Sequence, residues 1–155
     1  MAHIHRKGPI DPIQVDVKLS SGVPANTINI GDLVALESFA AVPAQNFTWD
    51  TDEATTQTNF AAAFAGMSTS RSRASTTDTR DLQITVDTDG YIEMDCVSDN
   101  YDLGEYVGPD SESSQLKQTV KVVSAKSKAV AVVIEKAPAA STRVLCRLVN
   151  TIPKR

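Results

Sequence analysis

Short segments in which apolar and polar residues alternate fill most of the second half of the chain. The runs DLQITVDTDG (81–90), YIEMDCVS (91–98) and TRVLCRLV (142–149) each place every second side chain on one apolar face. A period of two is typical of a β-strand with one buried face. Many such segments, separated by frequent turns, predict a small β-barrel or β-sandwich.

The clearest turn signal in these runs is Asp89-Gly90. It stands between two alternating segments, and this pair of residues tolerates the positive φ angles of a type I′ turn. The sequence therefore predicts a β-hairpin around residues 82–98. Further strands are expected at EYVGP (105–109), at both ends of 118–137, and at 142–149.

The first half of the chain gives a weaker strand signal. Residues 13–20 (IQVDVKLS) and 28–38 (INIGDLVALES) are expected to be strands, and the segment before them reads as an extended N-terminal arm. Residues 40–49 are expected to be a loop because Pro43 interrupts them. Residues 68–81 have no apolar period and are expected to form a long exposed loop.

One segment, 50–66, has the composition of a helix. Asp50 is a candidate N-cap, and Glu53 follows at the spacing of a capping box. We expect a short helix near 51–60 that leads into a strand. The predicted fold is thus mainly β, with one short α-helix, an N-terminal arm and first strand in residues 1–20, and a single β-barrel domain in residues 21–155.

Charge and apolar patterning exclude some classes of partner. The formal net charge is −4, with a pI of about 5.1, whereas proteins that grip nucleic acid through phosphates present a basic surface. We expect no direct contact with nucleic acid. No secretory leader or apolar run of membrane length is visible, so synthesis in the cytoplasm and no membrane contact are expected. Cys96 and Cys146 lie in alternating runs and read as buried thiols, with a disulfide as the alternative.

The sequence offers little support for catalysis. Both histidines, His3 and His5, lie in the arm, so a catalytic triad would require that arm to fold over the body. Two imidazoles at this spacing could share a metal, but two ligands alone hold one weakly. The segment GEYVG (104–108) lacks the Lys-Ser/Thr ending and the following helix of a phosphate loop. We expect no enzyme activity, and no catalytic, metal or cofactor site.

The exposed segments favour contact with another protein, and three of them supply candidates. The arm carries charged and imidazole side chains, and the Ser/Thr-rich loop carries two arginines. One loop carries two aromatic residues, which either anchor an interface or close the end of the barrel. The candidate interface residues are His3, His5, Arg6, Lys7, Phe47, Trp49, Arg71 and Arg73.

The order of several motifs resembles a known family. The stretches IGDLVALES, TNFAAAFAGMS, LQITVDTDGYIEMDCVS, LGEYVGPDSES and AVAVVIEKAPAASTRVLCRLV, spread over residues 28–149, look like those of the tailed-phage capsid decoration (cement, or head-stabilising) proteins. The long loop 68–81 and the 29-residue N-terminal segment depart from that pattern. No functional residue of the family is carried over, because the resemblance concerns turns and strands.

The resemblance implies a structural virion protein on the capsid exterior. Such a protein bridges subunits of the major capsid protein and commonly acts as a homotrimer, so that weak contacts multiply. A second hypothesis is a non-enzymatic β-barrel that binds a ligand, such as a carbohydrate, in a tail or surface assembly. That hypothesis predicts a concave site with several exposed aromatic side chains.

Overall fold

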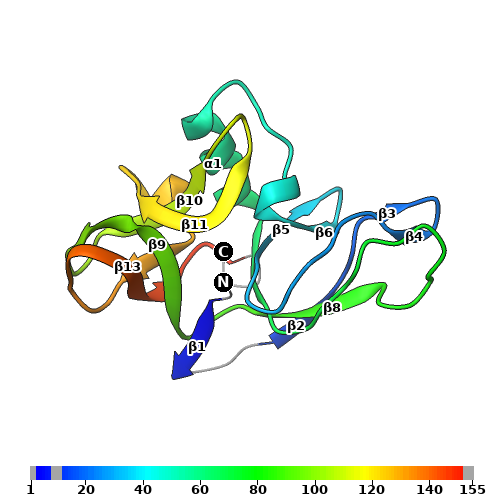
Figure 1. Ribbon diagram of the computed structural model, residues 1–155, viewed down its shortest axis with the longest axis horizontal. Helices are drawn as coiled ribbons and strands as arrows, with labels where there is room; N and C mark the ends of the chain where they lie inside the picture. Colours follow the sequence, from blue (N-terminus) through cyan, green and yellow to red (C-terminus); the bar gives the residue numbers. More distant parts are fainter. Residues whose placement is uncertain (1–2, 8–11, 152–155) are drawn as a thin grey trace.

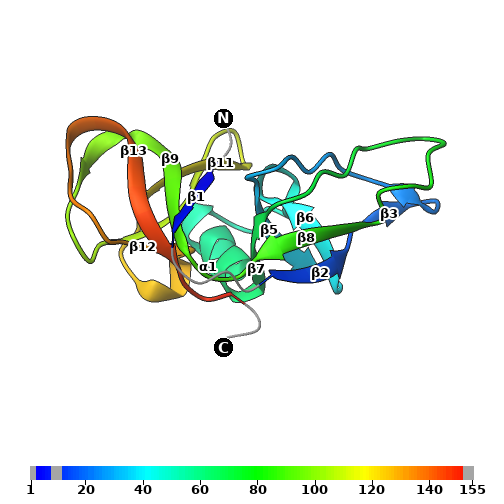
Figure 2. The same cartoon turned by 90° about the horizontal axis from the view of Figure 1, so that it is seen from below.

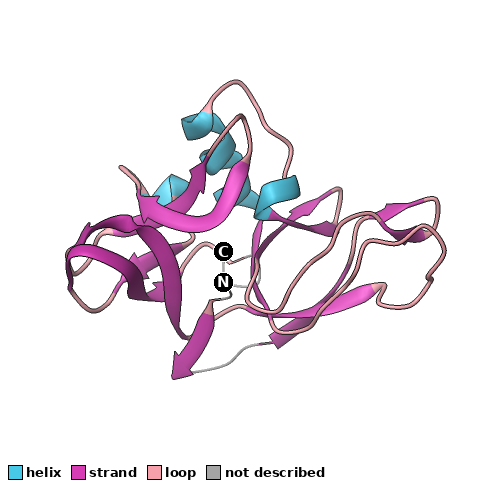
Figure 3. Cartoon of the chain, viewed as in Figure 1, coloured by secondary structure: helices cyan, strands magenta, loops and turns pink. Residues whose placement is uncertain are grey.

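The computed structural model describes residues 3–7 and 12–151 of the chain. Within them the protein is mainly β, and one α-helix and two short 3₁₀ helices accompany the strands (Figure 3). The predicted fold class, a small β-barrel with one short helix, is confirmed. In the described part of the chain, no helix combines the length and the apolar character that a membrane crossing requires.

The larger part of the fold is a β-barrel made mostly by the C-terminal half of the chain. Its strand order is β1-β9-β11-β10-β12-β13, and an additional antiparallel pairing of β9 with β13 closes the last five strands into a barrel. Strand β1 pairs with β9 and lies outside this closure. The strands are β1 (Ile4–Lys7), β9 (Tyr91–Tyr101), β10 (Tyr106–Ser111), β11 (Leu116–Val122), β12 (Ala131–Val133) and β13 (Ala137–Leu148).

The smaller part is a five-stranded sheet in the order β2-β8-β7-β5-β6, which lies beside the barrel (Figure 1). A parallel bridge between Val17 and Ala41 brings its two edges together, so the sheet curls around its own core. A short hairpin, β3–β4, extends from its far end. The strands are β2 (Pro12–Asp16), β3 (Leu19–Ser20), β4 (Val23–Pro24), β5 (Leu33–Glu37), β6 (Ala40–Pro43), β7 (Phe64–Ser68) and β8 (Gln83–Asp87).

Two apolar clusters form the cores of these two parts, and strands β5 and β7 contribute side chains to both clusters. Leu33 and Phe64 pack in the cluster that fills the barrel and the space beneath the helix. Val34 and Ala65, the next residues along each strand, pack in the cluster enclosed by the smaller sheet. Because successive side chains of a strand point to opposite faces, the pair β5–β7 ties the two cores together.

Helix α1 (Glu53–Ala63) lies where the two parts meet and packs on β5 of one and on β10 and β11 of the other (Figure 2). Asp52, not the expected Asp50, is the N-cap, and its side chain accepts a hydrogen bond from the backbone N–H of Thr55 at 2.7 Å. Asp50 instead accepts one from the N–H of Thr51 at 2.6 Å. The strand expected after the helix is present as β7, beginning at Phe64.

The predicted hairpin at Asp89-Gly90 is wrong. Both strands exist, but β8 pairs with β2 and β7 in the smaller sheet, whereas β9 belongs to the barrel. The turn is a crossover between the two parts. Asp89 is buried there, and its carboxylate accepts a hydrogen bond from Nε of Arg147 at 3.1 Å. The local signal located the turn but not the partners of the strands on either side of it.

A second correction concerns residues 40–49, where a loop was expected. Residues Ala40–Pro43 form strand β6, which pairs with β5, and a 3₁₀ helix (Ala44–Asn46) follows. Pro43 is tolerated because it is the last residue of the strand. The hairpin β5–β6 therefore turns at Ser38-Phe39, a dipeptide without a usual turn signature.

Candidate interaction surface

Phe39 is the most exposed large apolar side chain among the described residues. It stands at the tip of the β5–β6 hairpin and is 93% exposed. Ser38 and Phe39 both have positive φ angles, 50° and 66°, between the paired residues Glu37 and Ala40. This is the φ pattern of a two-residue type I′ loop, which normally uses Asn-Gly.

The backbone conformation of Phe39 has an energetic cost, and burial of its ring within the chain does not offset that cost. A left-handed backbone at a residue with a side chain costs about 1–2 kcal/mol, and a ring that is 93% exposed gains almost no burial in return. Strained backbone recurs at binding sites, which makes an exposed and strained aromatic residue a candidate for contact. Only 5% of the residues are aromatic. It is therefore notable that one of these few side chains is exposed to solvent.

Glu37 braces the base of this hairpin. Its Oε1 accepts a hydrogen bond from the backbone N–H of Thr48 at 2.8 Å, and its Oε2 accepts one from Oγ1 of Thr48 at 2.8 Å. Nζ of Lys18 lies 3.4 Å from the same Oε2. These contacts join the hairpin to the loop after β6 and to the segment that leads into β3, so the tip is presented on a fixed base.

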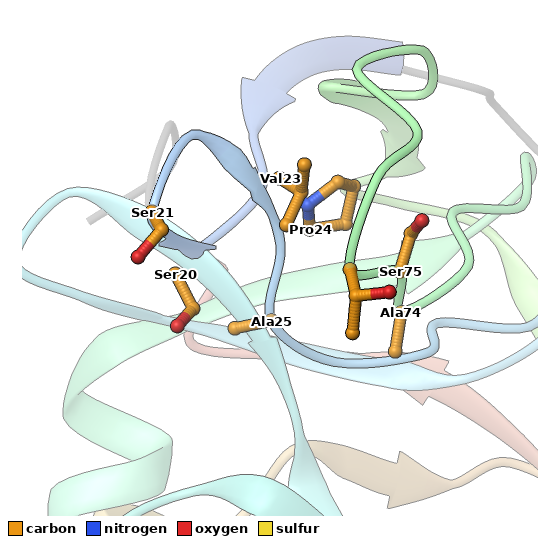
Figure 4. A pocket seen from close by; sticks show the side chains of 8 residues that line it. Ser20, Ser21, Val23, Pro24, Ala25, Ala74 and Ser75 are labelled. Atoms are coloured by element: carbon orange, nitrogen blue, oxygen red, sulfur yellow. The ribbon is translucent and has the colours of Figure 1, made fainter.

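An open hollow of about 780 Å³ lies at the far end of the smaller sheet (Figure 4). Ser20, Ser21 and Pro24, from the β3–β4 hairpin, line one side, and Ala74 and Ser75, from the long loop, line the other. The lining consists of hydroxyl, methyl and ring carbon groups and contains no charged side chain. The full set is Ser20, Ser21, Val23, Pro24, Ala25, Ala74, Ser75 and Thr76.

Backbone hydrogen bonds hold the two walls of the hollow together. The N–H of Ser75 donates to the carbonyl of Pro24 at 3.1 Å, and Oγ of Ser75 accepts from the N–H of Asp78 at 2.7 Å. Further down, Ile28 and Ser72 exchange two backbone hydrogen bonds of 2.7 and 3.0 Å. The Ser/Thr-rich loop is thus attached to the body on this side of the hollow.

Arg71 and Arg73 lie in this same loop, and both are exposed. Nearby, Nη2 of Arg80 lies 3.0 Å from Oδ2 of Asp78, and hydrogen bonds from Arg80 lower the pKa of that carboxyl. The proposed interface role of Arg71 and Arg73 stays a prediction, and the structure places them close in sequence to the loop residues of the hollow.

Phe47 and Trp49 lie in the loop that the sequence offered either as an interface anchor or as a cover for the end of the barrel. Both are partly buried and pack against the larger core. The ring of Phe47 meets that of Phe60 edge to face, with centroids 5.2 Å apart and an interplanar angle of 84°. These two residues cover the core beside the helix, so any interface role would use only their remaining exposed edges; that role stays a prediction.

The N-terminal arm docks on its own chain. His3 is buried: its Nε2 is 3.0 Å from the carbonyl oxygen of Gln118, and its Nδ1 accepts a hydrogen bond from the backbone N–H of Asp95 at 3.1 Å. Burial lowers the pKa of His3 to about 4. His5, Arg6 and Lys7 lie in β1, whose backbone pairs with β9. Their predicted interface role is untested, while His3 is enclosed within the monomer.

Several half-buried charges are engaged in structural pairs. Arg143 contacts Glu93 at 2.6 Å and also pairs with Asp95 on the wall of the barrel. Lys121 pairs with Glu53, the first residue of α1, and lies 3.4 Å from Asp110. Within residues 3–7 and 12–151 no three His, Cys, Asp or Glu side chains are placed to hold a metal ion.

Sequence reasoning missed both Phe39 and the hollow. The turn at Ser38-Phe39 contains neither Gly nor Asn, so the hairpin had no local signature. The one available signal was a large aromatic residue between two apolar segments, LVALE and AAVP. Comparisons with protein-family models, with curated proteins and with solved structures find no match to this chain.

Proposed function

We propose that this chain is a structural virion protein that decorates the outside of a viral capsid and stabilises the lattice by bridging subunits of the major capsid protein. Its site of action is the virion exterior, and it works as a homotrimer. The motif order that resembles tailed-phage decoration proteins supports this proposal. The observation that carries it is Phe39, an aromatic residue held in solvent at the cost of backbone strain.

An exposed aromatic ring on a braced hairpin is the usual form of an interface anchor, since most binding energy resides in a few such residues. A compact body with two interlocked cores gives the anchor a rigid base. Rigid bodies that present small anchors suit lattice stabilisation, in which each contact is weak and many act at once.

The alternative of a carbohydrate-binding barrel finds less support. The open hollow carries hydroxyl groups, but no aromatic side chain lines it. Sugar sites rely on aromatic faces for stacking, and the one strongly exposed aromatic ring, Phe39, stands at a hairpin tip.

The test is binding of the purified protein to capsid shells. Shells assembled from the major capsid protein encoded in the same genome would be mixed with the chain and sedimented. We expect saturable co-sedimentation and a higher temperature of shell disruption. The variant Phe39→Ser should bind more weakly, whereas Ala62→Arg, on the exposed face of α1, should bind as the parent does. Absence of saturable binding by the parent would overturn the proposed function.

A further inference from the structure

We propose that the edge of β9 beneath the N-terminal arm is a strand-acceptor site, which β1 occupies as a releasable strap. Its ligand is an extended peptide segment that places a neutral imidazole between β9 and β11, as His3 does. When β1 leaves, the same edge takes such a segment from another molecule by strand addition. The inference goes beyond the proposed function and does not rest on it.

The imidazole of His3 takes the place of one hydrogen bond in the β-ladder between β9 and β11. Val120 of β11 pairs with β9 in parallel, while on its other side it lies opposite Pro109, which has no N–H. The N–H and C=O of Val120 therefore face β9, and so do those of Gln118, two residues earlier. The next hydrogen bond of this ladder would join the carbonyl of Gln118 to the N–H of Asp95. The ring of His3 lies between them, with its nitrogens 3.0 Å from the first and 3.1 Å from the second.

The groups on either side of the ring are held by contacts that do not involve β1. The side-chain amide of Gln118 accepts a hydrogen bond from the N–H of Leu33 at 2.6 Å and donates one to the carbonyl of Leu33 at 3.2 Å. It also donates to Oε1 of Gln45 at 2.8 Å. On the other side, Asp95 pairs through β9 with Arg143 of β13. Release of the strap therefore leaves these contacts in place.

Strand β1 contributes little to either apolar core. Its one apolar residue, Ile4, is 42% exposed and belongs to neither cluster. The strand pairs with β9 in an irregular register and lies outside the closure of the barrel. The N–H of His3 adds a hydrogen bond of 3.4 Å to the carbonyl of Gly31. Hydrogen bonds contribute modestly to net stability because water offers the same partners. The strap can therefore open locally while both cores stay intact.

The site accepts only the neutral ring. A protonated imidazole would direct its second N–H at the N–H of Asp95, which is itself a donor. The carboxylate of Asp95 favours the charged ring, whereas Arg143, in β13, and the amino terminus disfavour it. On the side of β5, Asp32 follows Gly31, and burial raises the pKa of its carboxyl. Burial of His3 is the largest effect and lowers its pKa to about 4. A free segment is mostly protonated below pH 6.5 and must lose that proton to bind.

Peptide complementation of the whole chain tests the site. The variant His3→Ala removes the ring that holds the strap, and a synthetic peptide of residues 1–10 is added up to millimolar concentrations. Hydrogen exchange of the Glu93 amide, followed by NMR, reports on the edge. Because the N–H of Asp95 faces the strap, that of Glu93, two residues earlier, faces it too. The N–H of Ile92 faces β13 instead, and it is the control for the fold.

In His3→Ala, we expect exchange about tenfold faster at Glu93 and unchanged at Ile92. The peptide should restore the protection of Glu93 with a saturable dependence on its concentration. A peptide with Ile4→Pro lacks the N–H of the residue that pairs with Glu93 and should not restore it. Binding of the unchanged peptide should be about thirtyfold weaker at pH 5 than at pH 7.5, because its free imidazole is then protonated.

Four results would overturn the inference. Unchanged exchange at Glu93 in His3→Ala would show that His3 does not hold the strap, and faster exchange at Ile92 would show that the barrel needs β1. A peptide that fails to restore protection would show that the vacated edge accepts no strand. Equal restoration by the Ile4→Pro peptide would place its binding elsewhere. These measurements use the purified chain alone, so their outcome is separate from binding to capsid shells.

Discussion

A hydrogen bond joins His3 to Asp95: the backbone N–H of Asp95, in β9, donates to Nδ1 of His3 at 3.1 Å. The other ring nitrogen, Nε2, faces the carbonyl oxygen of Gln118 at 3.0 Å. One nitrogen accepts and the other donates, so the site fits the neutral imidazole with its proton on Nε2. This arrangement attaches the N-terminal strand to the barrel.

The docking of this strand should weaken in acid. Burial lowers the pKa of His3 from 6.5 to about 4. A released arm therefore takes up a proton below pH 6.5 that the docked arm refuses, and docking weakens as the pH falls from 6.5 to 4. The interval between these values corresponds to about 3 kcal/mol at most. Hydrogen exchange of the Asp95 amide, measured across this range, should show the loss of protection.

The variant His3→Gln isolates this effect. A glutamine amide can accept from Asp95 and donate to Gln118, but it does not titrate in this range. We expect its Asp95 amide to lose less protection between pH 6.5 and pH 4 than that of the parent. An equal pH dependence in both proteins would show that another group, such as a carboxylate, releases the arm.

Phe39 should limit stability rather than supply it. Replacing Phe39 by Gly removes the strain of a left-handed φ of 66° and very little packing, so we expect a gain of about 1 kcal/mol in the free energy of unfolding. The matched variant Phe47→Ala removes a ring that packs on Phe60 and should cost about 2–3 kcal/mol. Urea denaturation of both variants measures the difference, and a loss of stability in Phe39→Gly would contradict the view that Phe39 serves contact alone.

Gly66 is required by a close approach between strands. It lies in β7 with a φ of 145°, and a Cβ there would overlap the carbonyl oxygen of Asp87 in β8. Gly66→Ala should therefore cost about 3 kcal/mol or more, seen as a lower midpoint of thermal unfolding. Gly22, with a φ of 81° and no atom within 4 Å of an added Cβ, is the control, and Gly22→Ala should cost only about 1 kcal/mol. Equal losses would mean that backbone conformation, and not the contact with Asp87, sets the cost.

The strands could be predicted from the sequence where alternation reflects a core on one side. In β9, the inward Ile92, Met94 and Cys96 are buried, while the residues between them are partly exposed. The partners of these strands could not be predicted, because the same alternation suits either sheet. Asp89-Gly90 gives a strong hairpin signal, yet Arg147, on a strand far along the chain, holds Asp89 in a crossover.

The candidate site was harder to predict for a related reason. Phe47 reads in the sequence as a loop aromatic, and only the packing of α1 reveals that Phe60 partly covers it. Phe39 falls between the strand expected at 28–38 and the loop expected at 40–49, and only the pairing of Glu37 with Ala40 places it at a turn. Exposure depends on contacts between distant segments, so composition and spacing locate aromatic residues without indicating which of them face solvent.

The thiols of the two cysteines should become reactive at different extents of unfolding of the barrel. Cys96 and Cys146 are both free and buried, as the sequence predicted, and burial raises the pKa of each thiol. Sγ of Cys96 contacts the carbonyl of Ser141 at 3.6 Å, where the pairing of β9 with β13 is irregular. Cys146 lies between Ile92 and Val133 in regular pairing. We therefore expect Cys96 to react first with a thiol reagent, through local opening of the barrel.

The variants Cys96→Ser and Cys146→Ser allow each thiol to be followed alone. Labelling of Cys96, in the Cys146→Ser variant, should depend weakly on urea concentration, because local opening exposes little surface. Labelling of Cys146, in the Cys96→Ser variant, should require global unfolding, and its rate should rise with urea with the full slope of the unfolding transition. If Cys146 reacted as fast as Cys96 in the absence of urea, the weak point of the barrel would lie elsewhere than at the irregular pairing near Ser141.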